Sequence, residues 1–577
     1  MVIVAGRPDL GPGAPRRYGL DVRPAVVLFV FGLALRLLFW HAGPDAGPAW
    51  HVGFQGDAPE WQKLAQNHAH GVVDELMRLP LRPPGMEWLV ATLWNGDPSA
   101  AWWPRAVFAA LGALVAPLVW LLLRQRLAPP AALLAAGLCA VSSNLLLLGS
   151  GLHVELPFLV LTLVAVLLHE RLVVRASVPI AIACGALNAA LCLLRAEHLL
   201  TFATLLSLLV WQGAPARWRT VGLATLAFVA TVTPWQLTAW SMTDAYNREG
   251  APNLPPAGVV IPSGLPWTAD ALTAVRALPA FQQAPTYQFV TDTVRVRGGR
   301  EVRAVDLDIV RQAYDCWPEP LPKSFVCLYG GLNFFLANTP EANGAFSREA
   351  LDRPPPLTGG DASYPPGLRR VLPRAGTIAF GYPPHLDAIV HGYRMGLHEL
   401  ASDPGGAALR LLRKAWFGGE GAVGGVGGYA LPIGLSGTRR PVDMVTATGW
   451  WPVVWRVGVL AVALAGLWTL RRERWAWPWF ALAVTRGIVV LAFFGYARQG
   501  ALCVPVVALG LAAAFARWPL PRWPALARPR VGIAVLVAIV ALEAWRARGV
   551  TALIDGAAAN AATADSAEHL PHAVEFR

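Results

Sequence analysis

Five stretches of the chain contain no Asp, Glu, Lys or Arg, and this feature limits the possible folds more than any other. They are residues 106–123, 127–154, 176–194, 220–243 and 499–516. Uncharged runs of roughly 18 or more residues are typical of membrane-spanning helices. The whole chain is 55% hydrophobic and only 15% charged, whereas soluble domains carry about 25% charge. The sequence therefore predicts an all-α polytopic membrane protein. It excludes a disordered chain, a collagen-like fibre and a small disulfide scaffold.

Weaker apolar segments raise the number of expected spans to about eleven. These spans are residues 24–42, 104–123, 129–148, 152–169, 178–194, 197–213, 220–240, 450–470, 477–496, 500–516 and 531–547. The stretch 180–212 is too long for one helix, and the charged sequence Arg195-Ala196-Glu197-His198 divides it into two spans.

Arginines determine the expected orientation. With the N-terminus inside, the inner segments hold 17 arginines and four acids, whereas the first outer loop, residues 43–103, holds three bases and seven acids. Cytoplasmic loops of membrane proteins carry an excess of Lys and Arg. The sequence therefore predicts a multi-pass protein with a cytoplasmic N-terminus and an extracytoplasmic loop 43–103.

This topology gives an expected domain organisation. It comprises a cytoplasmic segment 1–23, a transmembrane catalytic domain 24–240, an extracytoplasmic domain 241–449 of mixed or unknown fold, C-terminal transmembrane helices 450–548 and a tail 549–577. Cys316 and Cys327 lie in the second outer region, and they could form a disulfide if that region faces an oxidising compartment.

The formal net charge of +12 does not indicate nucleic-acid binding, because no basic block alternates with aromatic residues as single-strand binders require. His385, His391 and His398 are spaced six and seven residues apart. This spacing favours a polar helical face over a metal site. No cofactor is predicted with certainty, and a divalent metal is left open.

Six charged residues from distant parts of the sequence are expected at the outer membrane boundary. They are Asp57, Arg82, Glu155, Arg195, Glu197 and Arg498. All except Arg498 have a simpler alternative. Asp57 could be a solvated loop acid, Arg82 a lipid-snorkelling cation and Glu155 a helix-capping acid. Arg195 and Glu197 could pair only with each other.

The expected placement of all six residues at one face favours a functional site over these separate alternatives. The orientation that places them there is derived from the inner arginines and not from the six residues themselves. Tyr496 precedes Arg498 by two residues at the same face. Arg486 lies near the middle of an expected span, where a charge must face a partner or a cavity. The sequence points to no specific partner for it.

The order of these motifs resembles the GT-C glycosyltransferases. The resemblance rests on Gly56-Asp57 in a long outer loop, Arg82-Pro83-Pro84, Ser150 to Glu155 and Arg195-Ala196-Glu197, with a weaker match at Tyr496-Ala497-Arg498. It covers roughly residues 24–240. The chain looks most similar to bacterial protein O-mannosyltransferases and to the aminoarabinose transferase of lipid A, which implies a bacterial inner-membrane location.

In that family, the donor is a sugar on polyprenyl phosphate, and an acid in the first outer loop deprotonates the acceptor during an inverting transfer. The resemblance implies that Asp57 is this base and Glu155 a second catalytic acid that orients hydroxyl groups. It implies that Arg82, Arg195, Glu197, Tyr496 and Arg498 bind substrate. Pro59-Glu60-Trp61 departs from the usual continuation after the acid.

The expected partners are therefore a polyprenyl-phosphate-linked sugar, the lipid bilayer and an extracytoplasmic lipid, glycan or protein acceptor, but no nucleic acid. Two other classes stay open. A secondary transporter would place paired ionisable residues near the bilayer midplane and show repeat symmetry. A non-catalytic membrane protein of envelope polysaccharide assembly would need no base at Asp57.

Overall fold

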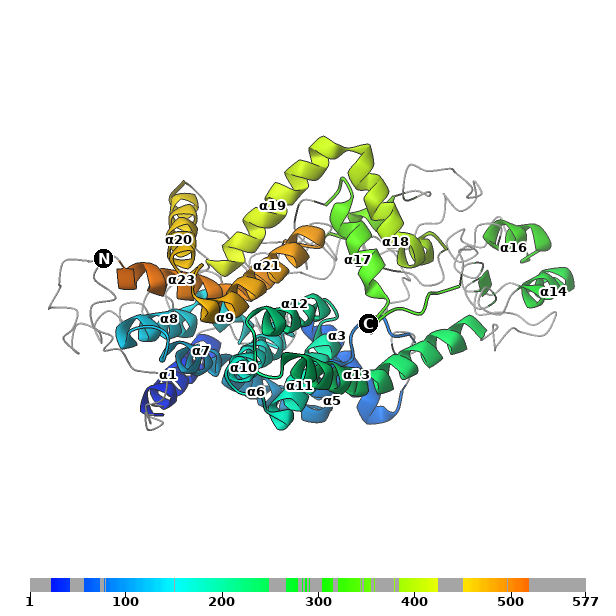
Figure 1. Cartoon of the computed structure of the whole chain (residues 1–577). Helices are drawn as coiled ribbons and strands as arrows, with labels where there is room; N and C mark the ends of the chain where they lie inside the picture. The colour runs from blue at the N-terminus through cyan, green and yellow to red at the C-terminus, as the bar shows by residue number, and fades with distance from the viewer. Residues whose placement is uncertain are drawn as a thin grey trace.

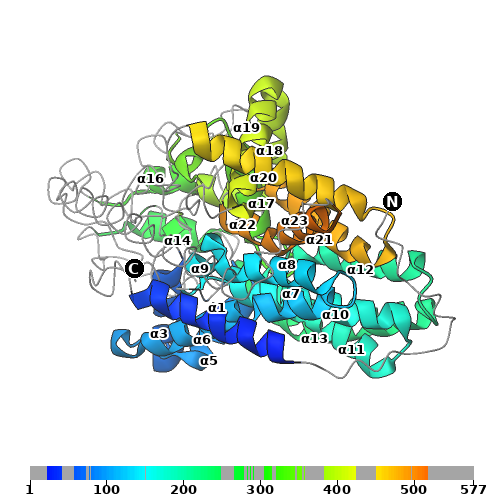
Figure 2. The same ribbon diagram turned by 90° about the vertical axis from the view of Figure 1, so that its left-hand side faces the viewer.

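The computed structural model describes residues 22–41, 57–72, 77, 79–149, 151–248, 266–278, 283, 286–287, 290, 304–314, 320–342, 344, 347–353, 357, 378, 383–423, 450–495 and 497–517. Within these residues the protein is helical, and its β-structure is a single bridge between Trp267 and Val305. Figures 1 and 2 show most of the helices gathered into one bundle.

The N-terminal part of the bundle contains α1 (Arg23–His41), α6 (Trp102–Ala113), α7 (Val115–Leu123), α8 (Pro129–Val141), α9 (Ser143–Leu148), α10 (Glu155–Val174), α11 (Val178–Leu194), α12 (His198–Trp211) and α13 (Arg217–Arg248). The C-terminal part contains α20 (Trp450–Thr469), the 3-10 helix η5 (Arg474–Ala476), α21 (Trp477–Ala492), α22 (Ala497–Ala501) and α23 (Val504–Arg517). The largest core cluster joins both parts, since Phe108, Leu163 and Leu509 are fully buried within it.

The first outer loop forms two helices of its own, α3 (Ala58–His70) and α5 (Gly85–Leu93), followed by the 3-10 helix η2 (Pro98–Ala100). The second outer region contains α14 (Ala269–Ala277), α16 (Leu307–Tyr314), α17 (Tyr329–Asn338), η3 (Glu349–Asp352), α18 (Pro383–Ser402) and α19 (Pro404–Ala422).

Helices occupy each expected span from 24–42 to 500–516, but their lengths differ from the expectation. The expected span 104–123 lies within one continuous helix, whereas the expected span 129–148 is divided at Ser142, whose backbone leaves the helical conformation. Four helices are long and apolar enough to cross a membrane: Pro98–Leu123, Glu155–Val174, Arg217–Arg248 and Arg474–Ala492. The expected number of eleven is not confirmed, and span 531–547 lies outside the described residues. The predicted division of 180–212 is confirmed, because α11 ends at Leu194 and α12 begins at His198.

Contacts between distant segments bring the predicted inner turns together at one end of the bundle. Arg126 Nη2 lies 3.4 Å from Glu170 Oε2, which joins the end of α7 to the end of α10. Gln212 Nε2 donates to the carbonyl oxygen of Arg474 at 2.9 Å, which joins the end of α12 to η5. The candidate site residues lie at the opposite helix ends, as the predicted topology requires.

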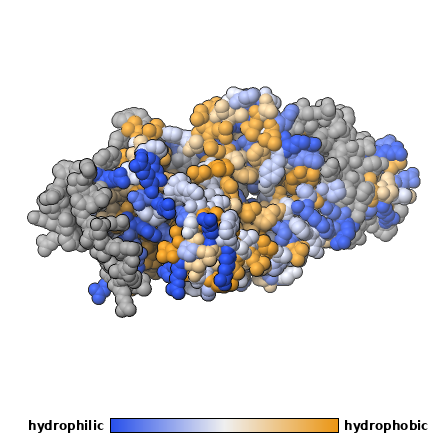
Figure 3. Space-filling view, viewed as in Figure 1, coloured by the Kyte–Doolittle hydropathy of each residue, from blue (hydrophilic) through white to orange (hydrophobic). Residues whose placement is uncertain are grey.

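The helices α17 and α19 of the second outer region pack directly on the bundle, whereas α14 and α16 pack on each other. α17 packs against α18, and their shared core includes Leu81 from the first outer loop and Phe494 from the end of α21. α18 and α19 form a hairpin that stands out from the bundle (Figures 1 and 2). The hairpin exposes large apolar side chains such as Leu397 and Leu412, and it forms the hydrophobic area at the top of Figure 3.

We expect residues 241–449 to lie outside the cytoplasm. A reporter fused near Gly360, a position outside the described residues, should be active if it requires export and inactive if it requires the cytoplasm. A fusion after Arg175, in a predicted inner turn, should give the reverse. A Gly360 fusion active only in the cytoplasm would overturn the orientation and, with it, the extracytoplasmic location of the site.

Candidate active site

Asp57 lies immediately before α3, at a boundary that water can reach. Pro59 in the first turn favours the start of a helix here, and the Asp57 side chain makes no cap hydrogen bond to the backbone of α3. Its carboxylate instead accepts a hydrogen bond from Arg498 Nη1 at 3.0 Å and lies 3.6 Å from Arg82 Nη1. The Asp57 side chain is 30% exposed. Asp57 is therefore an ion-paired acid with access to solvent, rather than a freely solvated one.

Arg82 is held by a short segment between α3 and α5. The backbone N–H groups of Leu328 and Tyr329 donate to the carbonyl oxygens of Pro80 and Leu81 at 2.8 and 3.1 Å. Gly85 permits close packing on the end of α11, because a Cβ atom there would lie too near the carbonyl oxygen of Leu193. These contacts aim Arg82 at the outer ends of the bundle helices, where it faces acids rather than lipid.

Glu155 and Arg195 meet between the start of α10 and the end of α11. Arg195 Nη1 donates to Glu155 Oε1 at 3.1 Å, and Arg195 Nε donates to Glu197 Oε1 at 2.6 Å. The Arg195 guanidinium also lies over the ring of Phe158, 5.8 Å from its centroid. Arg195 thus pairs with Glu197, as the simpler alternative proposed, and in addition bridges to Glu155.

Arg498 connects the two halves of the site. It is carried by the short helix α22, which packs against α19 and α9. Gly500 allows this packing, because a Cβ atom at that position would collide with the carbonyl oxygen of Gly418. Besides its bond to Asp57, the Arg498 guanidinium places Nε 3.8 Å from Glu155 Oε1. Asp57 and Glu155 therefore share one guanidinium, which comes from a residue more than 300 positions further along the chain.

Together these contacts form an ionic chain in which acids and arginines alternate. Its order is Glu60, Arg82, Asp57, Arg498, Glu155, Arg195, Glu197 and Arg486. All six charged residues expected at the outer boundary belong to this chain. Four carboxylates balance four guanidinium groups, so these eight groups carry no net formal charge.

Two members of this ionic chain, Glu60 and Arg486, were not assigned to the site from the sequence. Glu60 Oε2 lies 2.6 Å from Arg82 Nη2, although Glu60 had been noted only as a departure from the family pattern. Glu60 lies three residues after Asp57 at the start of a helix, and residues with this spacing lie on one face of a helix. This spacing was the signal in the sequence for a shared contact. Arg486 Nη1 lies 3.5 Å from Glu197 Oε1, which supplies the partner that the sequence could not name.

The arginines control the ionisation of Asp57. Burial alone raises the pKa of the Asp57 carboxyl, but the charges of Arg498 and Arg82 outweigh it and hold the pKa well below its usual range. For Arg82 the directions are reversed. Burial lowers its pKa, but the charges of Glu60 and Asp57 outweigh burial and raise the pKa above the ordinary value. Asp57 is therefore fully ionised near neutral pH.

Glu155, in the ionic chain, and His153, two residues before it, each have a buried side-chain atom without a hydrogen-bond partner in the described structure. Glu155 is 1% exposed, and its Oε1 faces Arg195 while Oε2 is unpartnered. His153, 7% exposed, has an unpartnered Nδ1 in the turn before α10. Buried polar atoms usually have partners, so these two are candidates for contact with a bound molecule.

Three further expectations from the sequence concern Tyr496, the disulfide and a metal site. Tyr496 and Cys316 lie outside the described residues, and Cys327 carries a free thiol. The binding role of Tyr496 therefore stays a prediction, whereas the free thiol of Cys327 contradicts the expected disulfide. His385 is buried, and its Nε2 is hydrogen-bonded to the carbonyl oxygen of Leu351 at 3.1 Å. Within the described ranges, no group of three His, Cys, Asp or Glu side chains is arranged to hold a metal ion.

Comparison with known proteins gives similarities only among solved structures. No protein-family model and no curated protein matches the chain. The apo crystal structure of the Archaeoglobus fulgidus oligosaccharyltransferase matches at 15% identity and a TM-score of 0.41, over 93% of this chain and 56% of that one. A structure of the same enzyme, AglB, with an inhibitory peptide and a dolichol-phosphate matches at 15% identity and a TM-score of 0.41, over 91% and 56%.

A third structure of this enzyme, tethered to an acceptor peptide, matches at 12% identity and a TM-score of 0.38, over 92% of this chain and 55% of that one. The chain thus spans little more than half the length of these structures. At these scores the likeness assigns neither a family nor a role to any residue of this chain. The predicted similarity to protein O-mannosyltransferases and aminoarabinose transferases stays a prediction.

Proposed function

We propose that the chain is an integral-membrane inverting glycosyltransferase, which moves a sugar from a polyprenyl-phosphate donor to an extracytoplasmic acceptor. The observation that carries this proposal is the position of Asp57, a solvent-accessible carboxylate held between Arg82 and Arg498 at the ends of apolar helices. A lipid-anchored phosphate reaches such a boundary from the bilayer, and an acceptor reaches it from water.

In the proposed reaction, Asp57 accepts the proton of the acceptor hydroxyl while the acceptor oxygen attacks the anomeric carbon. The bond between that carbon and the phosphate oxygen breaks, and its electron pair stays on the lipid phosphate. Arg82 and Arg498 stabilise this developing charge, since guanidinium groups bind phosphate with two donors. Glu155 Oε2 accepts a hydrogen bond from a sugar hydroxyl.

The ion pairs make Asp57 a weak base until the donor binds. General bases work best with a pKa near the working pH, whereas the two arginines hold the pKa of Asp57 far lower. The donor phosphate competes for those same arginines. When Arg82 and Arg498 turn towards the leaving phosphate, their charges no longer offset the effect of burial on the pKa of Asp57. The basicity of Asp57 therefore rises. Donor binding therefore prepares the base for proton transfer.

A lipid-linked sugar assay tests this function directly. Purified protein in nanodiscs should convert a polyprenyl-phosphate sugar into polyprenyl phosphate, detected by mass spectrometry, and glycosylate an added acceptor. A panel of donors that differ in the sugar identifies the one transferred. Absence of turnover with every donor, in protein that remains folded, would contradict the proposal.

One observation favours a secondary transporter as a second candidate. Glu197 and Arg486 form an ion pair beside Phe158, with the Arg486 side chain only 5% exposed, and transporters place such pairs inside the membrane. Solute uptake into proteoliposomes without release of polyprenyl phosphate would support transport. Release of polyprenyl phosphate without uptake would support the glycosyltransferase.

Replacing Arg82 by alanine should raise the KM for the lipid donor about tenfold and lower kcat, because one phosphate ligand is lost. Lysine should restore part of the activity, since it keeps the charge but not the two-donor fork. Donor titration of each purified variant measures both constants. Arg126→Ala removes an ion pair at the opposite end of the bundle and should leave both constants unchanged. Unchanged constants in Arg82→Ala would remove Arg82 from the donor site.

A further inference from the structure

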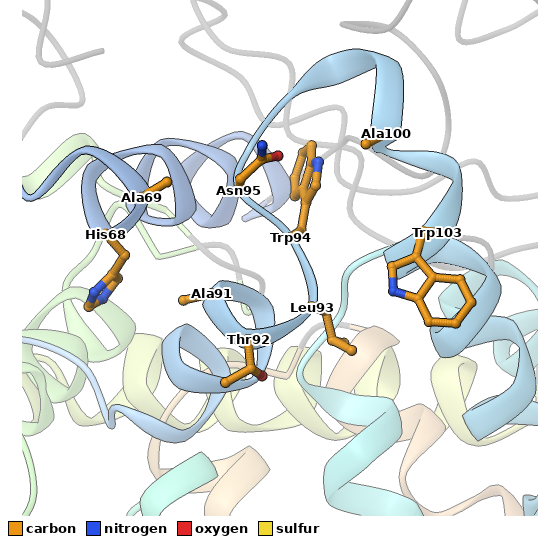
Figure 4. A pocket seen from close by; sticks show the side chains of 9 residues that line it. All are labelled: His68, Ala69, Ala91, Thr92, Leu93, Trp94, Asn95, Ala100 and Trp103. Carbon is orange, nitrogen blue, oxygen red and sulfur yellow. The ribbon is translucent and has the colours of Figure 1, made fainter.

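A cavity of about 410 Å³ lies in the first outer loop, away from the ionic chain. Its lining comes from the ends of α3 and α5, from η2 and from the start of α6, and consists of His68, Ala69, Ala91, Thr92, Leu93, Trp94, Asn95, Ala100 and Trp103 (Figure 4). This volume falls at the small end of the range for small-molecule sites. No residue of the ionic chain lines the cavity.

Two indole rings form one side of this cavity. Trp103 is 49% exposed, whereas Trp94 is buried and fixed by a hydrogen bond from its Nε1 to the carbonyl oxygen of Asp97 at 2.7 Å. Figure 4 shows both rings on one side and His68 on the other. An indole face carries negative charge density, so it attracts the weakly positive C–H groups of a flat ligand.

The polar lining groups are suited to hydroxyl groups. Asn95 Oδ1 accepts from the backbone N–H of Asp97 at 3.0 Å, which orients the side-chain amide. His68 Nε2 lies 2.6 Å from Glu87 Oε1, which holds the imidazole in place. Thr92 Oγ1 donates to the carbonyl oxygen of Leu89 and can accept from a ligand. The lining contains no Lys or Arg, so it does not favour a phosphate.

The cavity wall is built on α3 itself. Gln62 and Gln66 donate to the carbonyl oxygen of Gly96 at 3.1 and 3.0 Å, and Gly96 adopts a left-handed φ of +81°. A Cβ atom at Gly96 would collide with the backbone of α3, so only glycine allows this close approach. The turn that carries Trp94 and Asn95 is thus fixed before any ligand binds, which favours affinity.

We propose that this cavity binds a neutral pyranose unit of an acceptor saccharide. A pyranose combines an apolar C–H face with hydroxyl groups around its rim, which matches the indoles and the polar side chains of the lining. The assignment to the acceptor rests on the proposed function. Asp57 and His68 are eleven residues apart on α3, which corresponds to about 16 Å along the helix. The bound unit therefore lies some sugar units away from the reacting hydroxyl.

Binding measurements on the full chain in nanodiscs test this site without any donor. The probes are maltotetraose, cellotetraose and chitotetraose, each free in solution and each carried on a single-chain lipid, measured by saturation-transfer NMR. At least one saccharide should bind, Trp103→Ala should weaken binding about tenfold or more, and Trp103→Phe should retain most of it. Trp218→Ala, at an exposed tryptophan elsewhere, should change nothing.

The outcomes separate the site from the reaction. Binding that survives in Asp57→Asn supports a separate saccharide site, even if no donor is ever turned over. In active enzyme, Trp103→Ala should raise the KM for the acceptor with little change in kcat. Failure of every probe to bind the wild type would overturn the site, as would binding unaffected by Trp103→Ala. Displacement of the saccharides by phosphocholine headgroups would instead assign the cavity to membrane lipid.

Discussion

Replacing Asp57 by asparagine should abolish sugar transfer while the protein still inserts and folds. Asparagine keeps the shape and a hydrogen-bond acceptor for Arg498, but it cannot take up the proton of the acceptor hydroxyl. A positioned base contributes on the order of 10²–10⁴-fold to the rate, so kcat with a polyprenyl-phosphate sugar should fall by that factor. The KM for the donor should fall or stay constant, because the arginines lose a competing anion.

Asp308→Asn provides the matched control. Asp308 lies on α16, where its side chain is 83% exposed and 3.8 Å from Arg311 Nη1, and it belongs neither to the ionic chain nor to the cavity of the first outer loop. This variant should transfer sugar at close to the wild-type rate. Activity of Asp57→Asn within about tenfold of wild type would show that another group acts as the base.

The sequence predicted the members of the site better than their interactions. Uncharged runs predict helices, and arginine bias predicts which helix ends share a face, so Asp57, Arg82, Glu155, Arg195 and Arg498 could be placed together without any distance information. The pairings depend on side-chain directions at those ends, which neither hydropathy nor charge bias contains. Such pairings require the packing of the helices.

Two features show where sequence patterns carried less information. The break at Ser142 between α8 and α9 lies inside the uncharged run 127–154, so composition alone predicts one continuous span. The helices of the second outer region, such as α17, bury residues against distant segments including Leu79 and Phe494. Their position depends on contacts across the chain, and the sequence left the fold of 241–449 unassigned for this reason.

Arg498→Ala should lower kcat about 10²–10³-fold, because removal of one preorganised donor to a developing charge costs about that much. Arg498 also separates Asp57 from Glu155, and its loss leaves these two acids near each other without the shared cation. The pKa of Asp57 should then rise, because burial is no longer fully opposed. The acidic limb of the kcat/KM profile, set by protonation of the base, should move to higher pH.

A double-mutant cycle decides whether Arg498 acts through Asp57. If Arg498 acts mainly by controlling that base, the variant that combines Asp57→Asn with Arg498→Ala should be only slightly less active than Asp57→Asn alone. Groups that act as one unit show such non-additive losses. Combining Asp57→Asn with Arg126→Ala, whose ion pair lies at the opposite end of the bundle, should instead give the product of the two single effects. Fully multiplicative losses for Arg498→Ala, with no shift of the acidic limb, would mean that the contact of 3.0 Å between Arg498 and Asp57 has no part in controlling the base.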